Sequence, residues 1–147
     1  MKYLLDTCVL SELIKKNPSP KVIKWVSKID ENNLFLSVLT IGEIHKGIEK
    51  LPESNKKDKL HQWVNYDLKE RFRNRTIDFD HKTATVWGQI QAHSELSGRA
   101  MPAIDGQIAA TGISYDLTVV TRNTKDMEIS GAILHNPWQN THKPKSI

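Results

Sequence analysis

The chain has 147 residues and a single cysteine, and 38% of its residues are hydrophobic while 26% are charged. These values predict one globular domain with its own core, and they exclude a disordered chain and an intramolecular disulfide. The formal net charge of +4 is basic without being extreme, so charge alone identifies no partner.

Short apolar runs typical of strands alternate with longer amphipathic segments typical of helices. The strands are expected at residues 3–5, 34–37, 76–79, 117–121 and 132–134. The alternation predicts a mostly parallel sheet with helices on both faces. The helices are expected around residues 9–14, 22–29 and 41–51, along a long exposed stretch at 54–73, from a cap at Asp80 to near Gly98, and from about Ile104 onward.

The predicted elements form one domain over residues 1–138, followed by a polar tail at residues 139–147 that we expect to be frayed. No stretch approaches the roughly 18 apolar residues that a membrane span needs. An acid at position 6 comes too early for a signal peptide. We therefore expect a cytoplasmic protein that does not enter a membrane.

Four acidic residues lie where a predicted strand ends or a predicted helix begins: Asp6, Glu43, Asp105 and Asp126. In a parallel sheet these junctions share one edge, so the four side chains are expected to converge on one crevice. Each acid also has a purely structural explanation. Thr40 and Glu43 have the spacing of a capping box, and Asp105 and Asp126 would suit the first turn of a helix.

Converging carboxylates repel one another and stay ionised together only when a cation offsets the repulsion. Apart from the neighbouring Cys8, the donors are all oxygen, which favours Mg²⁺ or Mn²⁺ over zinc. An acid-held Mg²⁺ on a basic protein favours hydrolysis of phosphodiester bonds. Residues 50–75 fit this interpretation because they contain eight Lys or Arg and four acids, although a solvated helix face is the better explanation for any one of these residues.

Other phosphate chemistries fit the sequence less well. A phosphatase that forms an aspartyl phosphate on Asp6 needs a second aspartate two residues later, where this chain has Cys8. The motif GxxxxGK[ST] is absent, which excludes a P-loop nucleotide hydrolase. Arg99 and Arg122 are expected near the crevice, either on a phosphate or in structural ion pairs.

Four motifs resemble, in order and spacing, those of the PIN domain family. The resemblance is strongest to the VapC toxins of bacterial type II toxin–antitoxin pairs, especially their FitB-like branch, and it covers residues 1–138. Each motif alone is weak, but the ordered set is specific. The motifs lie at residues 4–7, 40–44, 102–111 and 120–126.

The resemblance implies a three-layer α/β/α sandwich and a Mg²⁺-dependent endoribonuclease that acts as a toxin. It also implies a small DNA-binding antitoxin as partner, and a homodimer. Asp6 and Asp105 would be the principal metal ligands, with Glu43 as the third acid of the pocket. The implied catalytic residues are Asp6, Glu43, Asp105 and Asp126, and the residues implied to contact the carboxylates or a phosphate are Thr7, Thr121 and Asn123.

Two positions depart from the family pattern. Asn123 stands where many PIN domains have an acid, and Asp126 either takes over part of that role or caps a helix. Cys8 stands where the family usually has asparagine, and a thiol is a much weaker hydrogen-bond donor than an amide. The alternative to an active nuclease is therefore a catalytically weakened PIN scaffold that binds RNA or a protein partner without cleavage.

Overall fold

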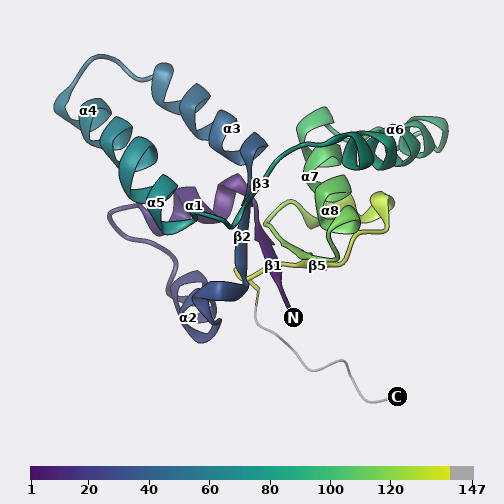
Figure 1. The fold of residues 1–147 in the computed structure, drawn as a ribbon, viewed down its shortest axis with the longest axis horizontal. Helices are drawn as coiled ribbons and strands as arrows, with labels where there is room; N and C mark the ends of the chain where they lie inside the picture. The colour runs from purple at the N-terminus through teal and green to yellow at the C-terminus, as the bar shows by residue number, and fades with distance from the viewer. Residues whose placement is uncertain (140–147) are drawn as a thin grey trace.

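A computed structural model describes residues 1–139, and a parallel five-stranded sheet forms its centre (Figure 1). The strand order β3-β2-β1-β4-β5 places β1 in the middle, and every pair is parallel. The predicted tail lies outside the described residues from Asn140 onward. The strands are β1 (Tyr3–Leu5), β2 (Leu34–Ser37), β3 (Thr76–Ile77), β4 (Thr118–Val120) and β5 (Leu134–His135).

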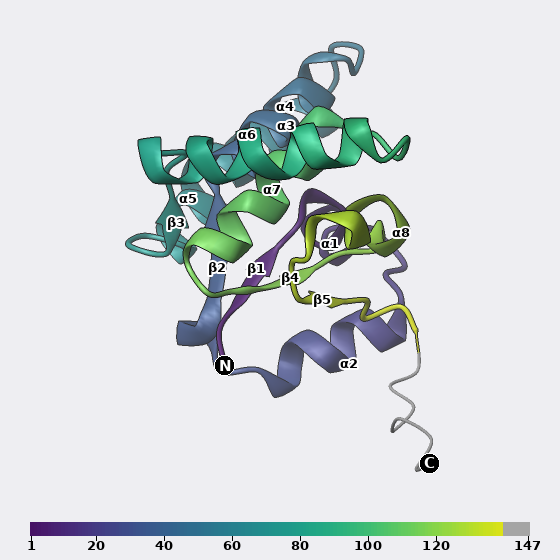
Figure 2. The same ribbon diagram turned by 90° about the vertical axis from the view of Figure 1, so that its right-hand side faces the viewer.

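Helices cover both faces of the sheet, as the sequence predicted (Figures 1 and 2). The helices on one side are α1 (Thr7–Leu13), α2 (Pro20–Lys28), α3 (Val38–Glu49), α4 (Asn55–Gln62) and α5 (Lys69–Arg71). Those on the other side are α6 (His81–Leu96), α7 (Ala103–Ser114) and α8 (Thr124–Met127), with the short helical turn η3 (Glu128–Ser130). A further turn, η1 (Glu31–Asn33), precedes β2 and contacts α5 through Glu31 and Arg71.

Each central strand contributes to two cores because successive side chains point to opposite faces. Leu5 and Val120 belong to the core beneath α1 to α5, whereas Leu4 and Val119 belong to the core beneath α7 and α8. All four side chains are fully buried. Burial on both faces explains why these strands appear in the sequence as continuous apolar runs.

The long helix expected at residues 54–73 is a helical stretch interrupted by a π-helical segment, η2 (Trp63–Leu68), between α4 and α5. Val64, Leu68 and Phe72 of this stretch are buried against the sheet. The wider winding of η2 keeps these side chains, spaced four apart, on the core side. The sequence indicated the inward residues but not the change in winding.

Most helices begin at the residues that the sequence favours. Asp80 caps α6 through a 2.9 Å hydrogen bond from the Thr83 amide. The cap of α3 is Ser37, which accepts from the Leu39 amide at 3.0 Å. The capping-box interpretation of Thr40 and Glu43 is therefore wrong, because α3 begins earlier at Val38. The last strand also begins later than expected, at Leu134 instead of residue 132.

Helix α7 packs closely against both β4 and α6. A Cβ atom at Gly112 would lie 2.6 Å from Val119 Cγ2 and 3.1 Å from the Leu117 carbonyl oxygen. A Cβ atom at Gly106 would lie 2.5 Å from Gln91 Oε1 and 3.2 Å from Trp87 Nε1. The two glycines thus set how near α7 approaches its neighbours.

None of the helices within residues 1–139 combines the length and apolar character that crossing a membrane requires.

The Gly112→Ala substitution should lower the free energy of unfolding by about 1–3 kcal/mol, because the added methyl group overpacks the contact between α7 and β4. Urea unfolding of the parent and the variant measures this difference. Gly88→Ala is the matched control, since a Cβ there meets nothing within 4 Å and alanine favours a helix interior. Equal loss of stability in both variants would contradict the packing argument.

Candidate functional site

Asp6 is the most buried of the four acids, with 3% of its surface exposed. It directly follows β1, the central strand, and caps α1. The Thr7 amide donates to its Oδ1 at 2.8 Å, and the Thr121 hydroxyl donates to its Oδ2 at 2.7 Å. Each oxygen of a buried carboxylate therefore has a partner, so the side chain is fixed between the ends of β1 and β4.

Glu43 lies in α3 and is tied to the same junction. The Thr7 hydroxyl donates to Glu43 Oε1 at 2.6 Å, while the Thr7 amide serves Asp6. Thr7 thus joins two acids that are far apart in the sequence. Because the Glu43 side chain points to Thr7, it does not cap the start of its own helix, α3.

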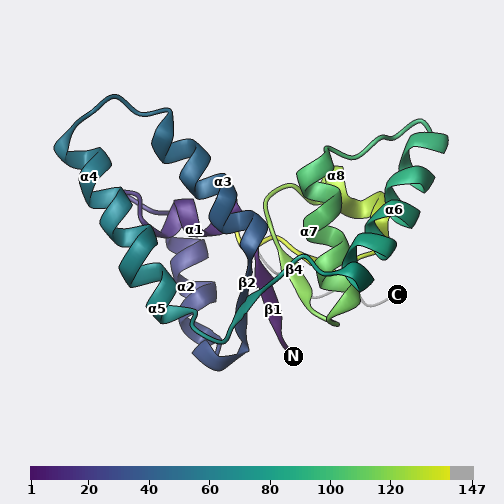
Figure 3. The same cartoon turned by 45° about the horizontal axis from the view of Figure 1, so that its top comes forward.

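Asp105 lies in the first turn of α7, on the other side of the sheet from α3. Burial raises the pKa of its carboxyl to about 6, and the negative charges of Asp6, Asp126 and Glu43 add to the increase. The four acids therefore share one electrostatic neighbourhood. In Figure 3 the helices that carry Glu43 and Asp105 stand on either side of the carboxyl end of β1.

The pKa of Asp6 is also raised. Burial is the main cause, and the charge of Glu43 adds to it, whereas the hydrogen bonds from Thr121 and Thr7 lower the pKa. The two threonines thus stabilise the ionised form of a carboxylate that burial disfavours. A cation in this neighbourhood would do the same for all four acids.

The oxygen donors of these acids suit a hard divalent cation such as Mg²⁺. Within the described chain, no three His, Cys, Asp or Glu side chains form a compact group of direct ligands. Mg²⁺ usually retains several waters and binds one or two protein carboxylates, so it does not require such a group. The raised pKa of Asp105 is the observation that fits a cation, whereas the roles of Asp6, Glu43 and Asp105 as its ligands stay predictions.

Cys8 lies beside this network without joining it strongly. Its Sγ is 3.8 Å from Asp6 Oδ2 and 3.8 Å from Thr121 Oγ1, and it accepts from the Arg122 amide at 3.4 Å. Burial and the charge of Asp6 raise the pKa of the thiol to about 11. Cys8 therefore stays protonated near neutral pH and is no nucleophile.

The segment after β4 holds the remaining predicted residues. The Asn123 amide donates to Thr121 Oγ1 at 2.9 Å, so the backbone of Asn123 supports the threonine that holds Asp6. Asp126 lies in the first turn of α8 and is exposed. Its charge contributes to the raised pKa of Asp105, so Asp126 belongs to the acidic neighbourhood as well as to a helix start.

The two arginines expected near the crevice, Arg99 and Arg122, have different kinds of partner. Arg99 forms an ion pair with Glu128, with 2.7 Å between Nη2 and Oε1. The Arg122 guanidinium lies over the Trp138 ring, 4.7 Å from its centroid. The sequence indicated neither partner, because the residues are distant along the chain and no spacing rule joins them.

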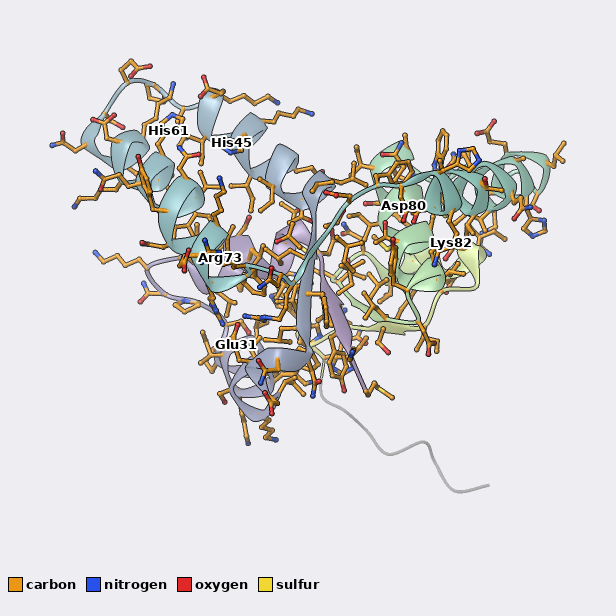
Figure 4. All side chains as sticks on the ribbon, in the orientation of Figure 1. Glu31, His45, His61, Arg73, Asp80 and Lys82 are labelled. Atoms are coloured by element: carbon orange, nitrogen blue, oxygen red, sulfur yellow. The ribbon has the colours of Figure 1, made fainter. Side chains whose placement is uncertain are left out.

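Several cations of the basic segment at residues 50–75 are paired in the structure. Arg71 and Arg75 both bind Glu31, at 2.8 and 2.9 Å. Arg73 lies 3.6 Å from Glu70, and Lys57 lies 3.0 Å from Glu53. In Figure 4, Glu31 and Arg73 lie on the same side of the molecule as His45 and His61. Asp80 and Lys82 lie on the other side. The segment is therefore less available to phosphates than its composition indicated.

Residues 3–129 match the family model described as "PIN domain". The toxin FitB of Neisseria gonorrhoeae is 33% identical over 135 residues, covering 92% of this chain and 97% of FitB. The tRNA(fMet)-specific endonuclease VapC of Shigella flexneri is 29% identical, covering 94% of this chain and 98% of VapC. A solved structure of FitAB bound to the IR36 DNA fragment superposes with a TM-score of 0.90 at 31% identity, covering 95% of this chain and 98% of that chain.

Asp105→Asn should stabilise the protein at neutral pH in the presence of EDTA. A carboxyl whose pKa is about 6 in the folded state, against an ordinary 3.8, stabilises the fold below pH 4 and loses that contribution as the pH rises through 6. We expect a gain of about 1 kcal/mol at pH 7.5, discounted for solvent screening, and none at pH 4. Urea unfolding at the two pH values measures it.

The control for this experiment is Asp58→Asn, the same change at an exposed acid in α4. It should give no gain in stability at pH 7.5, because an exposed carboxylate in the first turn of α4 favours the helix. A gain at Asp105 that is independent of pH would mean that the asparagine acts by packing and not by removing a charge.

Proposed function

Because the chain belongs to the PIN domain family, we propose that it is a metal-dependent endoribonuclease and the toxin of a type II toxin–antitoxin pair. Its likeness to FitB and to the VapC endonuclease covers more than nine-tenths of each chain, which supports the same role for the whole protein. The substrate would be RNA, and the reaction hydrolysis of a phosphodiester bond. Which RNA is cleaved depends on surfaces that differ among relatives.

One observation carries the proposal. Burial and three neighbouring acids raise the pKa of Asp105 to about 6, so the site keeps its carboxylates ionised only at an energetic cost. A protein gains nothing in stability from this arrangement, and perturbed acids of this kind are typical of catalytic sites. A bound divalent cation would remove the cost.

Asp6 and Asp105 would hold the cation, which we propose to be Mg²⁺, with Mn²⁺ as a substitute, and Glu43 would complete the acidic pocket. When bound, the cation would neutralise charge on the phosphate and make a water more acidic. The Thr7 and Thr121 hydrogen bonds fix Asp6 before the substrate arrives, so no ordering of this side chain is needed during the reaction.

Glu43 would be the group that accepts a proton. Its Oε1 is engaged by the Thr7 hydroxyl, so Oε2 is the oxygen available to a water that attacks phosphorus. The attack forms one P–O bond and breaks the bond from phosphorus to the leaving oxygen, which takes up a proton. Asp126 would add negative charge on the exposed side of the site. It would thus replace the acid that many PIN domains have at the position of Asn123.

The proposed partners are an antitoxin and a second copy of the chain. A small DNA-binding antitoxin would neutralise the toxin, and the similarity to FitAB, which has been solved in complex with a DNA fragment, supports a partner of this kind. We propose that the chain is a homodimer, as the family resemblance implies.

Asp6→Asn should reduce RNA cleavage at least about 100-fold, because it removes the negative charge of the best-anchored acid while keeping the size of the side chain and one acceptor oxygen for the Thr7 amide. Cleavage by the parent should stop with EDTA and return with Mg²⁺. Gel analysis of end-labelled RNA measures both effects. Asp58→Asn should cleave at the parental rate.

The result separates the proposal from its alternative. Full cleavage by purified Asp6→Asn, or by the parent in EDTA, would overturn the metal-dependent mechanism. Tight RNA binding by the parent without cleavage in Mg²⁺ would support a weakened scaffold, in which Cys8 fails to replace the asparagine usual in the family.

Asp126→Asn should lower the cleavage rate about tenfold if Asp126 contributes charge to the site, while Asn123→Asp in that variant should restore part of the loss. The charge of Asp126 adds to the raised pKa of Asp105, and the backbone amide of Asn123 donates to the Thr121 hydroxyl oxygen. Single-turnover cleavage rates of Asp126→Asn and of the double variant show whether an acid at position 123 compensates for the loss of Asp126. An unchanged rate for Asp126→Asn would leave Asp126 with a structural role at the start of α8.

A further inference from the structure

A small basic pocket lies between α2 and β5, away from the acidic site. Its volume is about 200 Å³, and its lining includes Lys21, Lys24 and Lys28 from α2 and His135 from β5. The lysines are spaced by three and four residues, which places them along one face of the helix. Figure 2 shows α2 running beneath β5, the edge strand of the sheet.

The three lysines form no ion pair with any residue in the range 1–139, in contrast to the arginines that bind Glu31. All three lysines are exposed, so their positive charges are concentrated on one face of α2 at the pocket. An anionic ligand would reduce the repulsion between them.

His135 provides a second, independent indication of a ligand. Its Nε2 is buried and has no hydrogen-bond partner among the described residues. The ring is held 4.9 Å from the Trp25 ring at an interplanar angle of 31°, and Tyr3 packs edge-on to Trp25 at 5.0 Å. The Trp25 contact fixes the ring, and its nitrogen is a hydrogen-bonding group in the wall of the pocket that the described residues leave without a partner.

The pocket is connected to the acidic site through short contacts. The Thr121 amide donates to the His135 carbonyl at 2.9 Å, and Thr121 holds Asp6. On the other side of His135, Trp138 contacts the Arg122 guanidinium, and both neighbours of Trp138 in the sequence line the pocket. The pocket is therefore joined to the acidic site by a series of neighbouring contacts through His135, Trp138 and Arg122.

We propose that the pocket between α2 and β5 binds a backbone phosphate of the RNA whose scissile bond lies at the acidic site. This inference rests on the proposed ribonuclease function and extends it. A chain of regularly spaced phosphates would place one phosphate at the pocket lysines while another lies at the hydrolytic site. The Trp25 ring packs in the core and the pocket is concave, which disfavours a flat lipid surface.

The test measures RNA binding by a cleavage-deficient protein. In an Asp6→Asn background, the combined substitutions K21Q, K24Q and K28Q are compared with K50Q, K56Q and K59Q, which remove the same charge from exposed lysines at the end of α3 and in α4. The probe is a fluorescein-labelled single-stranded RNA of about 20 nucleotides and mixed sequence, in EDTA at several KCl concentrations. Fluorescence anisotropy gives the Kd and its salt dependence.

The α2 substitutions should raise the Kd at least about tenfold and reduce the slope of log K against log salt by about 2, as expected for three lost contacts to a single strand. The control substitutions should leave the slope unchanged. His135→Phe, which keeps a ring on Trp25 but removes the nitrogen, should raise the Kd about fivefold, the usual value of one hydrogen bond. With cleavage-competent protein, the α2 substitutions should raise KM and leave kcat unchanged.

Equal loss of binding in the α2 and control variants would overturn the proposal, since it would mean a general effect of charge. Parental affinity in the α2 variant while the unmodified protein still cleaves RNA would overturn the pocket and keep the nuclease. If the unmodified protein neither binds nor cleaves RNA, both proposals fail together. Binding of phosphatidylserine vesicles that only the α2 variant loses, with RNA affinity unchanged, would assign the pocket to a membrane surface instead.

Discussion

The structure depends on holding like charges near one another at the carboxyl ends of its strands. Asp6 is nearly inaccessible to solvent, and Glu43, Asp105 and Asp126 all add negative charge around it or its neighbour. Burial raises the pKa of Asp6 and of Asp105 and so disfavours their ionised forms. Hydrogen bonds to Asp6 from Thr7 and Thr121 oppose this effect and come from the residues that follow β1 and β4. The protein thus keeps at one place a charge density that only a cation can fully balance.

The fold makes this concentration feasible because every strand runs in the same direction. Parallel order brings the residues after β1 and β4 to one edge, and the helices that come next begin there. The side chain of Glu43 reaches the edge from α3 through Thr7, while α7 brings Asp105 from the opposite layer. Gly112 lets α7 approach β4 closely. The packing of two cores therefore determines the electrostatics of one site.

Much of this arrangement could be predicted from sequence because strands buried on both faces and acids at strand ends leave strong local patterns. The strands at residues 3–5 and 34–37 were predicted with their observed bounds. The capping box at Thr40 failed because its spacing fits a helix start, but Ser37 reaches the Leu39 amide first. Spacing rules describe what a residue can do alone, whereas the actual start depends on where the preceding strand ends.

Contacts between distant segments could not be predicted in the same way. The count of basic residues between 50 and 75 indicated a phosphate-binding surface, but Glu31, far away in sequence, binds Arg71 and Arg75. No sequence pattern indicates a role for the lysines of α2. Only the structure shows that they lack ion-pair partners among the described residues and share a pocket with His135. Net charge is a property of composition, whereas the availability of a charge is a property of the fold.

The π-helical segment at Trp63–Leu68 makes the outer layer tolerant of a change in length. A π-helical turn holds one residue more than the α-helical turn that it replaces. Losing that residue takes away about 100° of rotation, and the return to tighter α-helical winding restores about the same amount. The face of α4 before the segment and the buried side chains of Leu68 and Phe72 after it would therefore keep their orientation. A single-codon deletion here would shorten this layer by one residue without turning its buried face away from the sheet.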